Sequence, residues 1–563
     1  MTGVKSRWLH PLLMLVWLGI GTGLRLIWLT SKPPWTDEFS TIVFSLGNSF
    51  RTVPLDQAIA LDVLLQPLQP HPVGVLAVIQ HLLSESNHPP LYFMLAHWWM
   101  QLWSSSDGSL PSLWAARSLS ALLGAASIPA VYGLAWLAFR SRLVSQLAAA
   151  IMAVSPYGIF LAQEARHYTL AILWVIVSLG YLVITTQHIQ HRKPLPVWIT
   201  VSWIGINFLG ISTHYFFALT LSAEALCLIF LNWQQGRGWI DKKMRGQIYT
   251  VAAGAVVGCL VWLPIFLHNS HGNKLTEWIQ SGDRGLLAWI SPVGQAFAAW
   301  ITMLFLLPIE ASSLAVVMAS GFVMLIFFLW AVPIFSRSFR TWLKQPATRL
   351  ITQMFVGVVC SAIALFFVFT YAFGIDLTRG ARYNFVYFPA VIILLGASLA
   401  ACWNTPKNGK TSVALIWLMG LMSGLTVVCN LGYEKYYRPD LLVPMIQQVS
   451  QSPVLIATTH KTHVQTGEMM GIASVFKLSG SPATPLFLLA HQDQNPNTST
   501  TALQHTLTQV PRPLDLWLVN FHAPVTLNGC AAVHQLLPPV NGYEYQLYRC
   551  SSHDKKGVIS VHP

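Results

Sequence analysis

Long apolar runs recur from the N-terminus to about residue 431, separated by short polar or basic segments. A run of about eighteen or more apolar residues is long enough to cross the hydrocarbon core of a bilayer as a helix. The pattern predicts about eleven such spans: 11–30, 112–139, 143–159, 168–187, 197–213, 215–232, 248–267, 313–335, 350–372, 383–402 and 412–431. Two Trp-rich stretches, 89–103 and 286–308, are short or broken by Pro and Gly, and we expect them to lie along the membrane surface or re-enter.

Composition agrees with a mainly α, polytopic membrane helical bundle. The chain is 54% hydrophobic and 9% charged, whereas soluble chains carry roughly 25% charged residues. The net charge of +13 invites a nucleic-acid partner. That partner is excluded because the basic residues form no single patch and occupy alternate loops. The pairs and groups are Lys5 and Arg7; Arg140 and Arg142; Arg192 and Lys193; Arg237, Lys242, Lys243 and Arg245; Arg337, Arg340, Lys344 and Arg349; and Lys407 and Lys410.

Basic loops of a membrane protein face the cytoplasm. The N-terminus is therefore predicted to be cytoplasmic, in the cytoplasmic (plasma) membrane, with the region after residue 431 outside. The same rule requires 89–103 not to span, because otherwise Arg140 and every later basic loop would lie outside. We expect a transmembrane domain over 1–431, with a large first outer loop at 31–111 that carries interfacial helices.

Residues 432–563 are predicted to form a small C-terminal α/β domain outside the membrane. Short apolar runs read as strands, and helical patterning occurs near 440–451 and 501–509. The predicted strands are 453–457, 485–490, 514–519 and 543–548. Cys530 and Cys550 lie in this domain, where an oxidising compartment would permit a disulfide. The sequence leaves open whether they pair.

An acidic pair, Asp37-Glu38, follows the first predicted span within about ten residues. A carboxylate at a membrane face is costly unless it has a task or a partner. One task is to deprotonate an acceptor beside a lipid-borne substrate. The ordinary alternative is a solvated start of a loop.

Other polar residues gather near the predicted outer face. Arg25, Arg117 and Glu224 lie within spans, and each alone has an ordinary explanation, such as snorkelling to headgroups or an ion pair. Together, carboxylate, guanidinium and imidazole suit an acceptor to be deprotonated and an anionic leaving group to be held. The outer segments are His88-Pro-Pro-Leu-Tyr92, Ser155-Pro156, Gln163-Glu-Ala-Arg-His-Tyr168, Thr213-His-Tyr215 and Arg379-Gly-Ala-Arg-Tyr383.

From about residue 8 to 440 these motifs resemble the GT-C superfamily of membrane glycosyltransferases. The resemblance is to the glycosyltransferase family 39-like group, the bacterial relatives of protein O-mannosyltransferase and of the lipid A aminoarabinose transferase. It rests on the order and spacing of these segments: Trp35-Thr-Asp-Glu38, His88-Pro-Pro-Leu-Tyr-Phe93, Ala116-Arg-Ser-Leu-Ser120, Ser155-Pro156, Gln163-Glu-Ala-Arg-His-Tyr168, Thr213-His-Tyr215, Arg382-Tyr383 and Tyr436-Tyr-Arg-Pro-Asp440.

The resemblance implies inverting transfer of a sugar from a polyprenyl-phosphate donor to an acceptor hydroxyl, which belongs to a lipid, a glycan or a protein. Asp37 would be the base, and Glu38 would orient it or the acceptor. Arg166 and Arg382 would hold the leaving phosphate, followed by His88 and His167. The remaining substrate-binding residues of the matching motifs are Tyr92, Glu164, Tyr168, His214, Tyr215 and Tyr383. No cofactor or metal is implied, although some superfamily members use one.

This chemistry requires Asp37 to share a pocket with Arg166 and Arg382. Three other functions stay open. A transporter or flippase of lipid-linked sugars would use the intramembrane charges as a path, although we find no internal symmetry of the kind that transporters show. A scaffold would need no base at Asp37. A glycan ligase or polymerase would move a preassembled glycan. The sequence does not identify the sugar.

Overall fold

The structure is a computed structural model that describes residues 2–103, 110–236, 238–268, 277–280, 285–480, 484–495, 497–535 and 537–551. Contacts divide the chain into two compact units. The helical unit comprises Met1–Leu29, Leu82–Trp99 and Trp114–Glu434. The sheet unit comprises Thr30–His81, Met100–Leu113 and Lys435–Pro563. The first outer loop is therefore divided between the two units.

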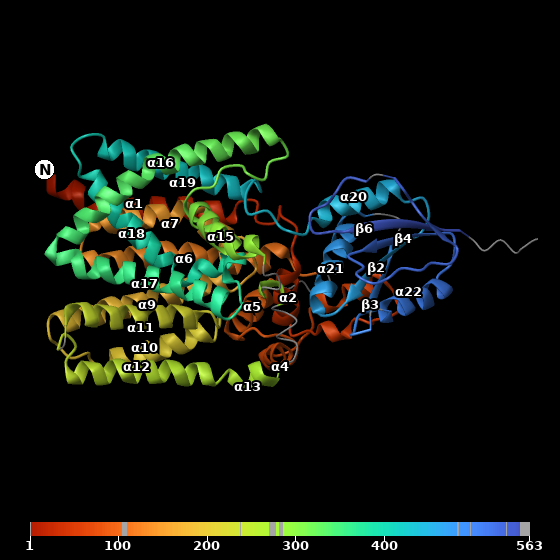
Figure 1. The fold of residues 1–563 in the computed structure, drawn as a ribbon, viewed down its shortest axis with the longest axis horizontal. Coiled ribbons are helices and arrows are strands. Elements are labelled where there is room, and N and C mark those ends of the chain that lie inside the picture. Colours follow the sequence, from red (N-terminus) through yellow and green to blue (C-terminus); the bar gives the residue numbers. More distant parts are fainter. Residues whose placement is uncertain are drawn as a thin grey trace, which may run out of the picture. The chain divides into compact units, whose positions relative to one another are not determined.

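Among the described residues, nine helices are long and apolar enough to cross a membrane, and the chain is a multi-pass membrane protein. All of them except α15 fall on predicted spans. They are α1 (Thr2–Leu26), α6 (Leu113–Phe139), α9 (Tyr168–Gln190), α11 (Phe217–Gln235), α12 (Lys242–Leu260, continued by α13, Leu263–His268), α15 (Leu286–Leu304), α16 (Leu314–Lys344), α17 (Pro346–Ala372) and α19 (Gly409–Val428). Several of these helices run side by side in the helical unit (Figure 1).

Three predicted spans take a different form. The stretch 143–159 is a broken pair, α7 (Arg142–Val154) and α8 (Pro156–Ala162), bent by 55°. The stretches 197–213 and 383–402 become shorter helices, α10 (Val197–Ile211) and α18 (Phe388–Trp403). α18 starts late because residue 389 is proline, which favours the first turn of a helix and disfavours helical backbone before it.

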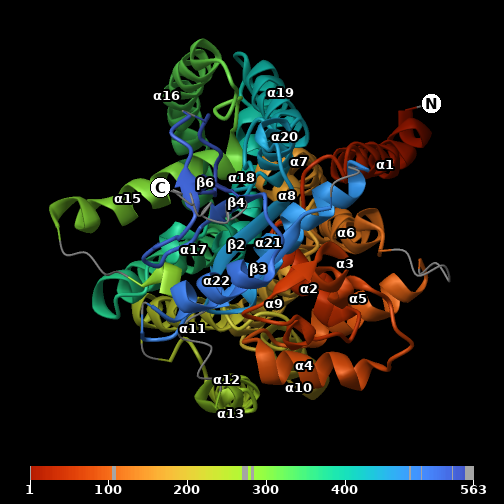
Figure 2. The same cartoon turned by 90° about the vertical axis from the view of Figure 1, so that its right-hand side faces the viewer.

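The two Trp-rich stretches also form helices. α5 (Leu91–Gln101) has 11 residues, so at 1.5 Å per residue it reaches only about half of the hydrocarbon thickness. α15 has 19 residues and contains Pro292. It meets the length and hydropathy of a span, but Figure 2 draws it lengthwise, whereas α12 is seen nearly end-on. That α15 lies along the membrane surface stays a prediction.

Arg25 donates hydrogen bonds to backbone carbonyls at the break between α7 and α8. Because Pro156 has no amide hydrogen, the carbonyl of Met152 loses its usual helical donor. The Arg25 guanidinium donates to the carbonyls of Met152 (3.0 Å), Ala153 (3.1 Å) and Gly21 (2.9 Å). Backbone groups at membrane depth must find partners within the protein. Arg25 is therefore structural.

Arg117 and Glu224 also have structural partners. An Arg117 Nη donates to the carbonyl of Leu29 at 2.7 Å. Glu224 accepts a 2.9 Å hydrogen bond from Ser178 Oγ, and Ser178 in turn contacts Asn207. Among the residues that the structure describes, no arginine pairs with Glu224, so the ion pair offered as its ordinary explanation is wrong. Its hydrogen-bond partner is instead the Ser178 hydroxyl on α9.

The sheet unit is built on six strands in the order β1-β3-β2-β4-β6-β5. Their bounds are β1 (Ala58–Ala60), β2 (Val454–His460), β3 (Leu486–His491), β4 (Leu514–Val519), β5 (Cys530–Ala532) and β6 (Tyr545–Cys550). β2 pairs in parallel with β3 and β4, and the other pairings are antiparallel. All four predicted C-terminal strands are present. β1 comes from the first outer loop, so that loop completes the sheet.

Helices α20 (Pro439–Val449), α21 (His463–Leu478), α22 (Thr498–Gln509) and α2 (Thr36–Ser45) complete the described core of the sheet unit. α2 approaches α21 closely. A Cβ at Gly467 would lie 3.3 Å from the carbonyl oxygen of Thr36, and one at Gly471 would lie 3.6 Å from the ring of Phe39. The absence of a side chain at Gly467 allows this approach, whereas the distance at Gly471 is an ordinary van der Waals contact.

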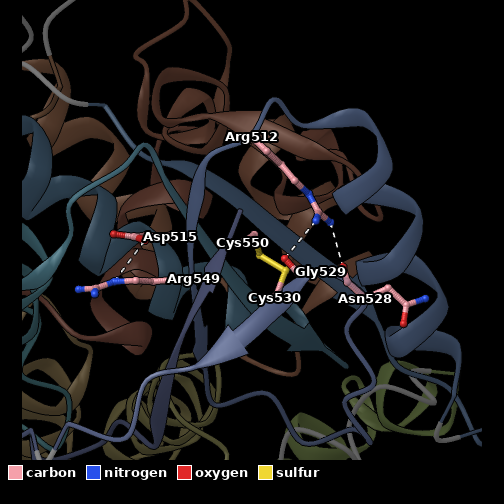
Figure 3. Close-up of a disulfide and its surroundings, with 7 residues drawn as sticks. All are labelled: Arg512, Asp515, Asn528, Gly529, Cys530, Arg549 and Cys550. Carbon is pink, nitrogen blue, oxygen red and sulfur yellow. Dashed lines mark hydrogen bonds and ion pairs between the residues drawn. A yellow bond between two sulfur atoms is a disulfide. The ribbon is translucent and has the colours of Figure 1, made fainter. Parts of the chain in front are cut away.

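Cys530 and Cys550 form a disulfide between β5 and β6, at directly paired positions (Figure 3). Beside it, the Arg512 guanidinium donates to the carbonyls of Asn528 and Gly529, both at 3.2 Å. These contacts fasten the turn that leads into β5. The structure thus answers the pairing that the sequence left open.

Candidate active site

Most of the predicted donor-site residues meet in the helical unit, although they come from four separate loops. His88 precedes α5, and Arg166 and His167 lie between α8 and α9. His214 lies between α10 and α11. Arg382 and Tyr383 belong to the short helix η5 (Ala381–Val386). We call this set, His88, Arg166, His167, His214 and Arg382, the cation cluster, after its two arginines.

Arg166 and His88 are joined directly. Arg166 is 1% exposed, and its Nη2 donates to His88 Nε2 at 3.0 Å. A guanidinium can only donate, so His88 Nε2 is the acceptor and the ring proton lies on Nδ1. That nitrogen is 3.0 Å from Ser86 Oγ. The arginine is held from its backbone side by Ser120 Oγ, which donates to the Arg166 carbonyl at 2.9 Å.

Tyr92 supports the same anchor. Its hydroxyl lies 2.7 Å from Ser120 Oγ, so the Arg166 backbone, Ser120 and Tyr92 form one buried chain of hydrogen bonds. Glu164 is buried in the same turn, and its carbonyl accepts from the Arg166 amide at 2.8 Å. These contacts fix the direction in which the Arg166 side chain leaves the turn.

His167 is fully buried, at 0% exposure, and neither of its ring nitrogens has a hydrogen-bond partner among the described residues. Its ring centroid lies 5.3 Å from His88, 4.7 Å from His214 and 4.7 Å from Tyr168. Burial lowers the pKa of His167 well below its usual range, and the charge of Arg166 adds to this effect. The side chain is therefore a neutral imidazole with one unused donor and one unused acceptor.

His214 is neutral for the same reasons. Burial lowers the pKa of its imidazole well below the usual range, and the neighbouring residues His88, Arg166 and Arg382 act in the same direction. The amide of Phe216 donates to His214 Nδ1 at 3.0 Å. Because Nδ1 accepts, the proton of the neutral ring lies on Nε2.

Arg382 is half-buried and lies over two aromatic rings, 5.1 Å from the ring centre of Trp278 and 5.8 Å from that of Tyr383. Its carbonyl accepts a 2.9 Å hydrogen bond from Tyr157. The Tyr383 ring is 6.3 Å from His214. Arg382 thus adjoins the histidines through the Tyr383 ring, over which its guanidinium lies.

An apolar cavity of about 430 Å³ adjoins this cluster. Tyr215 and Phe216 form part of its wall, and Phe216 also packs against Tyr383 at 4.7 Å and His214 at 5.2 Å. Its other lining residues are Ile211, Ala218, Leu219, Cys259, Ile279, Gln280, Phe369, Ile375 and Leu377. The cavity thus places a lipid-sized apolar space beside buried cations.

Asp37 and Glu38 fold within the sheet unit, in the first turn of α2. Acidic residues there are favoured by the positive end of the helix dipole. Asp37 is half-buried, whereas Glu38 is 0% exposed and its Oε2 lies 4.0 Å from Lys435 Nζ. Burial raises the pKa of the Tyr437 phenol, and the charges of Glu468 and Asp37 contribute. That Asp37 shares a pocket with the cation cluster stays a prediction.

Sequence reasoning missed three residues at these sites. Ser120 anchors Arg166, Trp278 carries Arg382, and Lys435 pairs with Glu38. Ser120 ends the Ala116-Arg-Ser-Leu-Ser120 motif, and Lys435 directly precedes the Tyr436-Tyr-Arg-Pro-Asp440 motif. The motifs therefore marked these regions of the sequence but did not indicate that Ser120 contacts Arg166 or that Lys435 contacts Glu38. In the described part of the chain, no group of three or more His, Cys, Asp or Glu side chains is placed to hold a metal ion.

No protein-family model matches the sequence, and no curated protein matches it. Similar solved structures include ArnT from Cupriavidus metallidurans bound to undecaprenyl phosphate, at 12% identity and a TM-score of 0.47, covering 97% of this chain and 98% of that one. The oligosaccharyltransferase of Archaeoglobus fulgidus in complex with Zn and sulfate has 13% identity and a TM-score of 0.45, covering 82% of this chain. This chain spans 61% of that protein's length.

Proposed function

We propose that this protein is an inverting glycosyltransferase that moves a sugar from a polyprenyl-phosphate donor to an acceptor hydroxyl at the outer face of the cytoplasmic membrane. One observation carries the proposal: the cation cluster of the helical unit, in which Arg166, His167 and His214 are buried, adjoins an apolar cavity of about 430 Å³. A polyprenyl phosphate matches this arrangement, because its anionic phosphate suits the two arginines and its apolar chain suits the cavity.

The charges of the cluster suit the leaving group. A phosphate ester gains negative charge when its bond to the sugar breaks, since a phosphate monoester carries about −1.5 to −2 at neutral pH. Arg166 and Arg382 are permanent cations with planar donor sets that fit phosphate oxygens. Fixed cations in a water-poor site stabilise the charge that develops in the transition state.

The two neutral histidines would supply hydrogen bonds without adding charge. His214 presents Nε2–H, and His167 has an unused donor and an unused acceptor. A buried polar group without a partner costs about 1–3 kcal/mol. A phosphate oxygen or sugar hydroxyl that accepted from His167 would remove that cost. The cavity has the size of an ordinary ligand pocket, roughly 300–1,000 Å³, and would take the first units of the lipid.

Asp37 would act as the base. The acceptor hydroxyl gives its proton to the Asp37 carboxylate while its oxygen forms a bond to the anomeric carbon. The bond between that carbon and the phosphate oxygen breaks, and the electron pair leaves with the polyprenyl phosphate. Attack opposite the leaving group inverts the anomeric centre. The half-buried position of Asp37 at the start of α2 supports this role.

The test is turnover by the full-length protein in lipid nanodiscs with a panel of polyprenyl-phosphate sugars, measured as release of free polyprenyl phosphate. We expect release from wild type and loss of about 100-fold or more in Asp37→Asn, the scale of removed general-base catalysis. Arg166→Ala and Arg382→Ala should mainly weaken donor use. Matched controls are Asp62→Asn, an exposed carboxylate in the sheet unit, and Arg340→Ala, an exposed arginine of the helical unit.

Other outcomes would point elsewhere. A flippase would move the lipid-linked sugar across the bilayer with its phosphate bond intact. A scaffold would be indifferent to Asp37→Asn. Equal polyprenyl phosphate release by wild type and Asp37→Asn would remove Asp37 from the mechanism. A product that contains a transferred oligosaccharide would identify a glycan ligase or polymerase.

A further inference from the structure

Lys435 is a buried cation in the sheet unit, beside the proposed base. It is 6% exposed, and its ammonium lies 4.0 Å from the buried Glu38 carboxylate and 5.4 Å from the centre of the Trp35 ring. Trp35 and Glu38 flank Asp37 in sequence. Burying a charge is costly unless it is paired, so these contacts give Lys435 a single favourable position.

The backbone around Asp37 is held from the same C-terminal segment. Gly467 of α21 allows α2 to approach so closely that an added Cβ would lie 3.3 Å from the Thr36 carbonyl oxygen, and a Cβ at Gly471 would lie in ordinary contact with Phe39 and the Pro34 carbonyl oxygen. The Asp37 carbonyl accepts from Thr41 Oγ1 at 3.0 Å, inside α2. The first turn of α2 is thus contacted from two sides: Lys435 lies beside the Glu38 and Trp35 side chains, and α21 packs against the backbone.

We propose that Lys435 is a positioning residue for Asp37, acting through Glu38 and Trp35. Successive residues of a helix point about 100° apart, since there are 3.6 residues per turn. Because Lys435 holds the Glu38 side chain in the interior, it fixes the rotation of the first turn of α2. That rotation sets the direction in which the Asp37 side chain leaves the helix. Lys435 also balances the Glu38 charge, so the turn does not bury an uncompensated carboxylate beside the base. This inference rests on the proposed function and makes the C-terminal segment part of the catalytic machinery.

The inference assigns Glu38 a supporting role. The resemblance left two tasks for Glu38, orienting Asp37 or orienting the acceptor. A side chain that is 0% exposed and paired with Lys435 suits the first task. Removing the lysine takes this cation away from the buried Glu38 carboxylate, which favours uptake of a proton by Glu38 or an outward turn that displaces the first turn of α2.

The central variants are Lys435→Met and the double variant Glu38→Gln with Lys435→Met. Displacement of a catalytic group by about 1 Å can cost about 100-fold in rate. We expect Lys435→Met to lower kcat per folded molecule by about 10- to 100-fold, with the KM for the donor within about twofold, because the donor site is built in the helical unit. The neutral double variant keeps the shape of the pair and should recover most of kcat. Lys477→Met, an exposed lysine on α21, is the matched control.

Two results would overturn the proposal: wild-type kcat per folded molecule in Lys435→Met, or a double variant as slow as the single one. The second result would indicate that Lys435 contacts the substrate itself. Amide hydrogen exchange gives a readout that does not depend on activity, and Lys435→Met should speed exchange in residues 37–42. If wild type releases no polyprenyl phosphate from any donor, the proposed function fails, while unchanged exchange in α2 defeats the positioning role separately.

Discussion

His167→Phe should make the protein more stable and less active. The wild-type ring is fully buried, and neither nitrogen has a partner among the described residues. Phenylalanine has a similar planar shape and no polar atoms, and the surroundings include the aromatic rings of Tyr92 and Phe93. Removing a buried unsatisfied polar group should therefore raise the free energy of unfolding by about 1–3 kcal/mol.

The same substitution removes a proposed donor to the phosphate or sugar. A hydrogen bond to a charged group contributes about 1.5–3 kcal/mol, which corresponds to about 10- to 150-fold in affinity. Thermal unfolding of the purified protein, with and without polyprenyl phosphate, measures both effects. We expect a higher transition temperature without ligand and a smaller ligand-induced rise than in wild type.

His188→Phe is the matched control, because His188 lies at the opposite end of α9 and its Nδ1 is hydrogen-bonded to the Ile184 carbonyl at 2.9 Å. It should show no gain in stability and no loss of ligand response. If His167→Phe lowered the transition temperature and left the response to polyprenyl phosphate intact, His167 would be a satisfied structural residue. The assignment of the cation cluster as a phosphate site would then lose its central imidazole.

Three further predictions concern stability. Arg25→Met should lower the yield of folded protein in size-exclusion chromatography, because it removes the donors to the Met152 and Ala153 carbonyls at the break, at about 1–3 kcal/mol for each orphaned group; a wild-type elution profile would contradict its structural role. Burial raises the pKa of Glu468 from 4.5 to about 8, so the folded protein keeps a proton that the unfolded chain releases, and stability should fall as pH rises from 4.5 to 8, by at most about 5 kcal/mol. Glu468→Gln should flatten that slope in thermal unfolding across this range, and an unchanged slope would assign it to other groups. Reduction of Cys530–Cys550, 20 residues apart, should destabilise the sheet unit by about 3 kcal/mol, visible as a lower unfolding temperature with reductant in wild type but not in a variant with both cysteines replaced by alanine.

The sequence by itself determined the class of the protein and most of its elements. A spanning segment in a bilayer satisfies its backbone hydrogen bonds as a helix, so the positions of α1, α6, α9 and α17 follow from the apolar runs along the sequence. The C-terminal strands were predictable for a related reason, since short apolar runs bounded by polar and turn-forming residues are typical of strands. Candidate site residues were found because polar groups near spans are rare and conspicuous.

Tertiary structure decided which of these groups meet. His88, Arg166 and His214 are far apart in sequence, and only helix packing brings their rings and guanidinium groups together. Arg25 illustrates the reverse case: its position within a span gave it no visible partner, and its carbonyl acceptors on Met152 and Ala153 became evident only from the break between α7 and α8.

Long-range pairing was equally hidden from the sequence. β1 joins β3 across more than four hundred residues, Cys530 meets Cys550 in one register of the sheet, and Lys435 pairs with Glu38 from the other end of the chain. The physical reason is common to all three. Local patterns report which backbone conformation and which degree of burial a segment prefers, whereas the partner of a buried charge, a strand edge or a thiol is set by the packing of the whole unit.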